Sequence, residues 1–187
     1  NRMSLLVILL RLVISHPINI FRFISFEKLS NYSLNIILKH ILINSHILSQ
    51  KLDWLHFGFA TMGIERENVA RAIGAKSAVS LRGFDIGLYP HQHPGCFTLL
   101  WDKVDKVHTI SDDLYLAAID IGLDPKTPFN KITPAINTKF FQSDSFENIH
   151  EPLRILTVGR LHWKKGYEYA LKALSLLIDK QIHFEYH

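Results

Sequence analysis

Cysteine is almost absent from this sequence: Cys96 is the only one among 187 residues. A single thiol excludes a disulfide framework and a cysteine-based zinc site, and it fits a reducing compartment, so we expect a cytoplasmic protein. Charged residues are also few, at 20% of the chain, whereas 48% of the residues are hydrophobic. This composition excludes a disordered or fibrous chain and leaves ample apolar material for a core.

Acidic residues are nearly missing from residues 1–50. This segment contains one acid, Glu27, and five basic residues: Arg2, Arg11, Arg22, Lys28 and Lys39. The rest of the chain carries equal numbers of basic and acidic residues, so the whole net charge of +4 belongs to the first fifty positions. A basic surface confined to one apolar segment argues against nucleic acid as a partner.

A long uninterrupted hydrophobic run is missing as well. The apolar stretch from Met3 to Ile14 is shorter than the roughly 20 residues that cross a bilayer, and Arg11 interrupts it. No small-residue cleavage site follows it. The next apolar stretch, residues 30–49, has helical spacing. Two interpretations of residues 1–50 stay open: helices that pack on a sheet, or a peripheral contact with the anionic inner face of a cytoplasmic membrane.

After residue 50, short apolar runs alternate with helical patterns, which is typical of an α/β fold with a parallel sheet. The runs predict strands at residues 53–57, 77–81, 106–110 and 131–133. Helices are expected over residues 63–73 and 112–121, the second with Ser111 as its N-cap and Gly122 after its end. The proline- and glycine-containing residues 88–95 are expected to form a loop.

Residues 142–152 are polar and lack periodicity, which predicts a linker between two lobes. Beyond it we expect a strand at 153–158, a loop at 159–166, a helix at 167–179 and a further strand from 182. The predicted domains are therefore 1–141, a partial N-terminal lobe, and 153–187, the beginning of a second lobe. Because a lobe cannot be built from one βαβ unit, and because the sequence opens with Asn, we expect a fragment.

The stretch Val158–Gly166 places a glycine-flanked basic loop between a strand and a helix N-terminus. Ligands bind at such positions in parallel sheets, and a helix N-terminus suits phosphate. Arg160 can bind phosphate oxygens with its forked guanidinium, and Lys165 can add a point charge. The alternative is a solvated basic loop, because the spacing matches neither common phosphate-binding glycine motif.

The segment "ILTVGRLHWKKGYEYALKAL" resembles the opening of the donor-binding lobe in retaining, nucleotide-sugar-dependent glycosyltransferases of the GT-B fold. It is most similar to family 4, which includes exopolysaccharide and colanic-acid type enzymes. The resemblance implies that Arg160 and Lys165 contact the donor pyrophosphate and act in catalysis. It places Gly159 and Gly166 in the same donor site.

Three earlier segments follow the order of motifs in the same family. "DWLHFGFA" is similar to a D-x-x-H-x-H-F motif, with Gly58 at the second histidine, and "AVSLRGFDIGLY" is similar to a strand and loop in which many members have His where Arg82 stands. The third segment matches a P-x-I-[DN]-x-x-x-F motif. The resemblance implies an acceptor side formed by His56, Arg82, Gly83 and Asp85. Two other interpretations stay open: a core histidine at His56, and a local ion pair between Arg82 and Asp85.

The resemblance implies two Rossmann-like, doubly wound lobes and transfer of a sugar, of the hexosyltransferase type, to a saccharide or lipid-linked acceptor in cell-surface polysaccharide biosynthesis. It implies no metal and no other cofactor, and the histidines near residue 92 lack the spacing of a metal site. The family's E-x7-E segment, which holds the donor, is not present, so we expect this chain alone to be inactive. The alternatives are a catalytically inactive binding module and another GT-B enzyme, such as a sugar-nucleotide epimerase.

Overall fold

The computed structural model describes residues 2–142 and 152–187, with no side chains described for residues 2–6 and 8. The chain divides into two compact units, Asn1–Ala135 and Ile136–His187, which we call the N-terminal and C-terminal units. The linker expected over residues 142–152 lies almost entirely outside the described residues.

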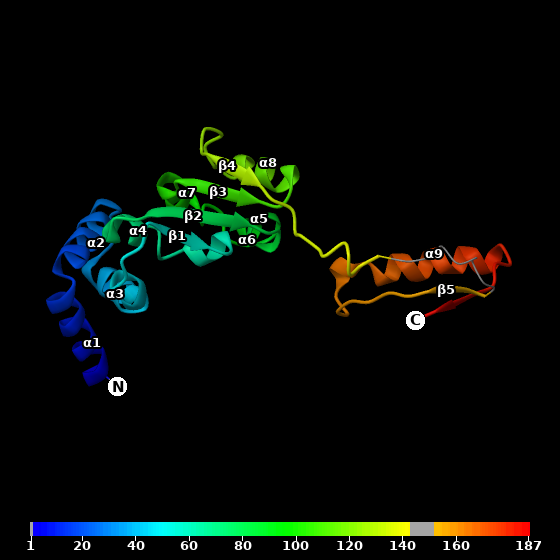
Figure 1. Cartoon of the computed structure of the whole chain (residues 1–187), viewed down its shortest axis with the longest axis horizontal. Helices are drawn as coiled ribbons and strands as arrows, with labels where there is room; N and C mark the ends of the chain where they lie inside the picture. Colours follow the sequence, from blue (N-terminus) through cyan, green and yellow to red (C-terminus); the bar gives the residue numbers. More distant parts are fainter. Residues whose placement is uncertain (1, 143–151) are drawn as a thin grey trace. The chain divides into compact units, whose positions relative to one another are not determined.

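The N-terminal unit begins with α1 (Arg2–Ser15), α2 (Pro17–Leu29) and α3 (Leu34–Leu48). Proline is tolerated in the first turn of α2 because the amide it lacks would have no partner there. These helices share a core with α4 (Val69–Ile73), and α2, α3 and α4 lie near the amino ends of the strands (Figure 1). The buried side chains of this core include Ile20, Phe23, Ile37, Ile41, Leu48 and Val69.

Four parallel strands follow, in the order β1 (Trp54–Phe57), β2 (Lys76–Leu81), β3 (Lys106–Thr109) and β4 (Phe129–Lys131). Each neighbouring pair is joined through helical segments, so the prediction of an α/β fold with a parallel sheet is confirmed, and the arrangement is Rossmann-like. The strand order runs in one direction, and the described residues contain no reversal of it. A doubly wound lobe would require such a reversal.

One face of this sheet carries the main core. Phe57, Val79, Leu81 and Val107 alternate with polar neighbours and are buried against the helical segments. Those segments are η1 (Ala60–Gly63), α5 (Phe84–Gly87), α6 (Tyr89–Gln92), α7 (Thr98–Lys103) and α8 (Asp112–Asp120). The side chains of His56, Ser80 and His108 stand at the alternate positions and therefore on the opposite face.

Several boundaries differ from the sequence-based expectations. The helix expected over residues 63–73 is reduced to Val69–Ile73, because Glu65 has a φ of 63° and interrupts the chain before it. The loop expected at residues 88–95 was wrong in part, since Pro90 lies in the first turn of α6, where it does not disturb helical bonding. The strand expected at 131–133 begins two residues earlier, at Phe129. The N-cap at Ser111 is confirmed: its hydroxyl accepts the Leu114 N–H at 3.3 Å.

The described part of the C-terminal unit contains β5 (Leu153–Ile155), the short η2 (Trp163–Lys165), α9 (Tyr167–Asp179) and β6 (Phe184–Tyr186). The two strands are parallel, with Leu153 opposite Phe184 and Ile155 opposite Tyr186. Strand β5 is shorter than expected, so residues 156–162 form an irregular loop between it and η2.

Candidate functional site

The loops after β1 and β2 are joined through Asp85, which is fully buried. One of its carboxylate oxygens accepts the Arg82 backbone N–H at 3.0 Å, and the other accepts the Ala60 backbone N–H at 3.1 Å. A buried carboxylate needs such donors to offset the loss of water. Asp85 therefore fixes the backbone of both loops through these two hydrogen bonds. Among the described residues, it forms no ion pair with the Arg82 guanidinium.

Arg82 is exposed directly after β2, with its guanidinium 5.7 Å from the centre of the Phe59 ring. Gly83 follows with a φ of 120°, a conformation that side-chain-bearing residues rarely adopt. This glycine lets the chain turn into α5, and the Arg82 side chain before it is exposed to solvent. The structure therefore brings the predicted residues Arg82, Gly83 and Asp85 together at the carboxyl end of β2.

A hydrogen-bonded row crosses the sheet at the same end; we call His56, Ser80 and His108 the histidine row. The Ser80 hydroxyl lies 2.9 Å from Nε2 of His56 and 2.8 Å from Nδ1 of His108. On its other side, Nε2 of His108 lies 3.2 Å from the carbonyl oxygen of Ile132, just after β4. The row therefore connects all four strands of the sheet.

Sequence reasoning found His56 but missed Ser80 and His108. Each of the three is the penultimate residue of its strand, in β1, β2 and β3 respectively. The register pairs Ser80 with His108 and His56 with Ala78, so all three side chains share one face and His56 reaches Ser80 diagonally. Polar residues on one face near the ends of three consecutive strands are the signal that could have revealed the row.

The electrostatic surroundings of His56 favour its neutral ring. Burial lowers its pKa below the ordinary value of 6.5, and the nearby His108 and the Arg82 charge lower it further. Desolvation and like charges both penalise the imidazolium form. His56 is therefore neutral at pH 7, with one ring nitrogen carrying a lone pair.

In the C-terminal unit, the predicted donor residues lie around the start of α9. A Cβ atom at Gly159 would lie 3.0 Å from the Tyr167 hydroxyl oxygen and 3.6 Å from Cδ of Lys165, so both side chains approach this glycine closely. Gly166 adopts a φ of 69° and forms the N-cap of α9. Lys165 thus lies beside Gly159 at the helix N-terminus, and Arg160 lies in the same loop; both residues are exposed.

The turn η2 supports this loop through its own backbone. The ring of His162 accepts the Lys164 N–H at 3.2 Å, and the His162 carbonyl accepts the Lys165 N–H at 2.8 Å. A cavity of about 390 Å³ lies against η2 and the first turn of α9, with Trp163 and Tyr169 in its wall. Arg160 and Lys165 are not among its lining residues.

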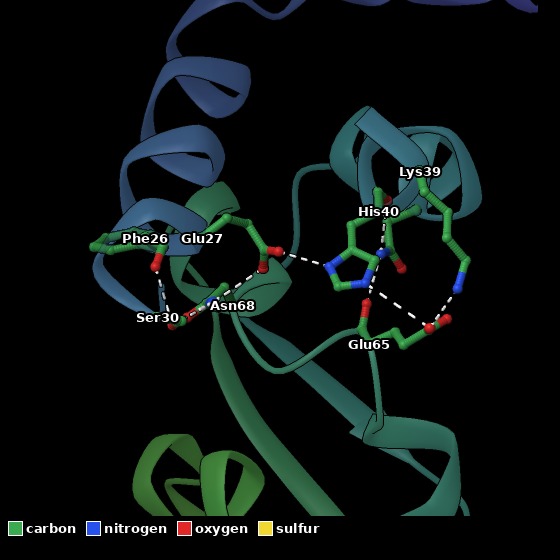
Figure 2. Close-up of polar contacts among 8 residues, drawn as sticks. Phe26, Glu27, Ser30, Lys39, His40, Glu65 and Asn68 are labelled. Carbon is green, nitrogen blue, oxygen red and sulfur yellow. Dashed lines mark hydrogen bonds and ion pairs between the residues drawn. The ribbon is translucent and has the colours of Figure 1, made fainter. Parts of the chain in front are cut away.

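A second polar group lies among the helices, and we call Glu27, His40 and Asn68 the buried cluster. The Glu27 carboxylate binds Nδ1 of His40 at 2.6 Å and accepts the Asn68 side-chain N–H at 3.0 Å (Figure 2). All three side chains are buried, and they come from α2, α3 and the residue before α4. Nearby, Glu65 forms an exposed pair with Lys39. The buried cluster joins these helical segments, and each carboxylate oxygen of Glu27 has a hydrogen-bond partner.

Within the described ranges, no three histidine, cysteine, aspartate or glutamate side chains are placed to hold a metal ion. Comparisons of the chain with protein-family models, curated proteins and solved structures found no match. A function must therefore be argued from the residues and their geometry.

Proposed function

We propose that the chain carries parts of the acceptor and donor lobes of a retaining, nucleotide-sugar-dependent glycosyltransferase with the GT-B fold. The observation that carries this proposal is the basic loop before α9, where Lys165 lies against Gly159 and Gly166 begins the helix. The matching V-G-R-L and K-G residues of the sequence support it. The proposed acceptor is a saccharide or a lipid-linked molecule.

The proposed chemistry breaks the bond between the sugar and the diphosphate, so negative charge develops on the leaving phosphate. Arg160 and Lys165 supply positive groups there, and the α9 N-terminus adds backbone N–H donors. The acceptor oxygen forms the new bond on the same face of the sugar, and its proton passes to an oxygen of the departing diphosphate. These side chains stabilise the charge without a metal ion.

The acceptor side of the proposal lies at the carboxyl ends of β1 and β2. There the exposed residues Arg82 and His56 adjoin loops that Asp85 holds in place. Functional loops of parallel sheets occupy this edge. Asp85 and Gly83 give the loops their shape, and His56 and Arg82 offer polar contacts to a saccharide.

The donor site can be tested on the chain as it exists. Nuclear magnetic resonance with pyrophosphate, then with nucleoside diphosphates, should shift the backbone signals of residues 159–166. Arg160→Ala and Lys165→Ala should each weaken binding about tenfold or more, because charge-assisted hydrogen bonds contribute about 1.5–3 kcal/mol. Lys180→Ala, beyond the end of α9, is the control that keeps wild-type affinity. Wild-type affinity in both loop variants would remove the donor site from the proposal.

Residues 1–50 support a further part of the proposal, a peripheral contact with an anionic membrane surface. Glu27, their single acid, is buried, whereas Arg11 and Arg22 are exposed. Large apolar side chains are exposed beside them, including Ile14 at 78% and Phe21 at 73%. No single helix among the described residues could cross a membrane, and the pair Leu9–Ser15 and Pro17–Leu29 is bent by 110°. The surface therefore offers positive charge and apolar contacts to a leaflet.

Vesicle flotation tests this contact. Binding to phosphatidylserine-containing vesicles should fall steeply as salt rises, and neutral vesicles should bind weakly. Arg11→Gln and Arg22→Gln should each cost about 1 kcal/mol of binding. Lys180→Gln should have no effect. Equal binding to neutral and anionic vesicles would contradict this part of the proposal.

A further inference from the structure

The backbone carbonyl at one end of the histidine row determines which atoms of the row donate and which accept hydrogen bonds. A backbone carbonyl can only accept a hydrogen bond, so Nε2 of His108, 3.2 Å from the Ile132 oxygen, must carry the hydrogen. In a neutral His108, Nδ1 is then the acceptor. The Ser80 hydroxyl, 2.8 Å away, donates its single hydrogen to that nitrogen.

Because the Ser80 hydrogen is used on His108, the hydroxyl oxygen can only accept from His56. Nε2 of His56, 2.9 Å away, must therefore carry the hydrogen of its ring. The lone pair of a neutral His56 is left on Nδ1, for which the described residues provide no hydrogen-bond partner. The contacts among the Ile132 carbonyl, His108 and Ser80 thus determine which ring nitrogen of the exposed His56 is the acceptor.

We propose that Ser80 and His108 are positioning residues that hold His56 in the Nε2–H tautomer, so that His56 Nδ1 accepts a hydrogen bond from a substrate hydroxyl. The hydroxyl assignment rests on the proposed function, with the hydroxyl belonging to the saccharide acceptor. The tautomer assignment does not rest on it. A bond to Nδ1 orients the saccharide through a hydroxyl other than the attacking one, whose proton still passes to the departing diphosphate.

Ser80 itself is not suited to act as a nucleophile. It is fully buried on the central strand, with an imidazole hydrogen-bonded on each side, so a substrate carbon cannot reach its oxygen. Burial suits a positioning role, because a hydroxyl without access to water keeps its two bonds fixed. The exposed member of the row is His56, and that is where a ligand can bind.

The tautomers can be measured directly on the full chain with ¹⁵N-labelled histidine at pH 8, where long-range ¹H–¹⁵N spectra distinguish Nδ1–H from Nε2–H rings. We expect both His56 and His108 as single Nε2–H tautomers. Ser80→Ala should convert His56 to a mixture, and His108→Phe should do the same by removing the acceptor of the Ser80 hydrogen. Ser77→Ala is the matched control, because Ser77 is also buried on β2 but bonds on the other face, to Lys103 and Asp105.

A second readout tests the ligand. Methyl glycosides, added as saccharide probes, should shift the His56 ring signals, and Ser80→Ala should weaken this binding about three- to tenfold, the scale of one neutral hydrogen bond. A mixed or Nδ1–H tautomer of His56 in the wild-type chain, or an unchanged tautomer in Ser80→Ala, would overturn the positioning role. Pyrophosphate binding without any saccharide effect on His56 would overturn the hydroxyl assignment alone, whereas failure at the donor loop leaves the tautomer result intact.

Discussion

The buried cluster and the histidine row are both built around hydrogen-bonded histidines, but they differ in where the bonds end. In the cluster, the His40 ring is 2% exposed and its Nδ1 is bound to a carboxylate that also binds Asn68. In the row, the bonds begin at a backbone carbonyl and end on an exposed ring. One network is buried among helices, and the other offers a lone pair on an exposed ring.

Because of this difference, we expect the buried cluster to contribute mainly to stability and the histidine row to contribute mainly to ligand binding. A buried network among α2, α3 and the chain before α4 contributes to helix packing and lies away from solvent. An open row loses little stability if its last residue changes, but it loses the atom that it presents. The same residue type should therefore respond very differently to substitution in the two places.

The largest effect is expected from breaking the buried cluster. Glu27→Ala removes the hydrogen-bond partner of the buried His40 ring and one of the two acceptors of the Asn68 amide, and each buried polar group left unsatisfied costs about 1–3 kcal/mol. Urea unfolding should show this as a large drop in the free energy of unfolding. Glu65→Ala is the control, since its pair with Lys39 is exposed and is worth less than about 1 kcal/mol. Equal effects of the two substitutions would contradict the structural role of this buried cluster.

A smaller effect on the free energy of unfolding, stabilising rather than destabilising, is expected from Glu67→Gln. Glu67 is buried near the cluster and has one carboxylate oxygen without a partner among the described residues. Burial raises its pKa above the ordinary 4.5, and the nearby Glu27 raises it further. The folded chain therefore keeps this proton at pH values where the unfolded chain has released it, so stability falls as pH rises through that window. Glu67→Gln does not titrate and should be the more stable form at pH 7, by about 1 kcal/mol.

Thermal unfolding at several pH values measures this. The advantage of Glu67→Gln over the wild type should grow as pH rises above the unfolded pKa of 4.5, and it should level off once the carboxyl is ionised in both states of the chain. Glu65→Gln should not show a growing advantage, since the Lys39 ammonium lowers the pKa of that exposed carboxyl. A stability difference for Glu67→Gln that does not change with pH would contradict the assignment.

The sequence indicated the parts of this molecule that depend on local chemistry. The apolar run at residues 77–81 and the cap at Ser111 are encoded by neighbours in the chain, and both lie where expected. The contact between Glu27 and His40 depends on how two helices pack, and the line of His56, Ser80 and His108 depends on strand register, neither of which is visible in a single segment. In the loop before α9, which we propose as the donor site, the residue types were recognisable from the sequence, but the approach of Lys165 to Gly159 was not.

The smallest effect is expected at the exposed end of the histidine row, and it concerns the pKa of His56 alone. Burial, His108 and the Arg82 charge together lower that pKa below 6.5. Arg82→Gln removes one positive charge and should raise the His56 pKa, which an NMR titration of the ring measures; Lys76→Gln, a charge at the other end of β2, is the control. Because the folded pKa of His56 lies below the unfolded value, this group's contribution is present above pH 6.5 and is lost as pH falls through the folded pKa. Arg82→Gln should therefore reduce the loss of stability on acidification, and an unchanged His56 pKa would place the guanidinium too far from the ring to affect it.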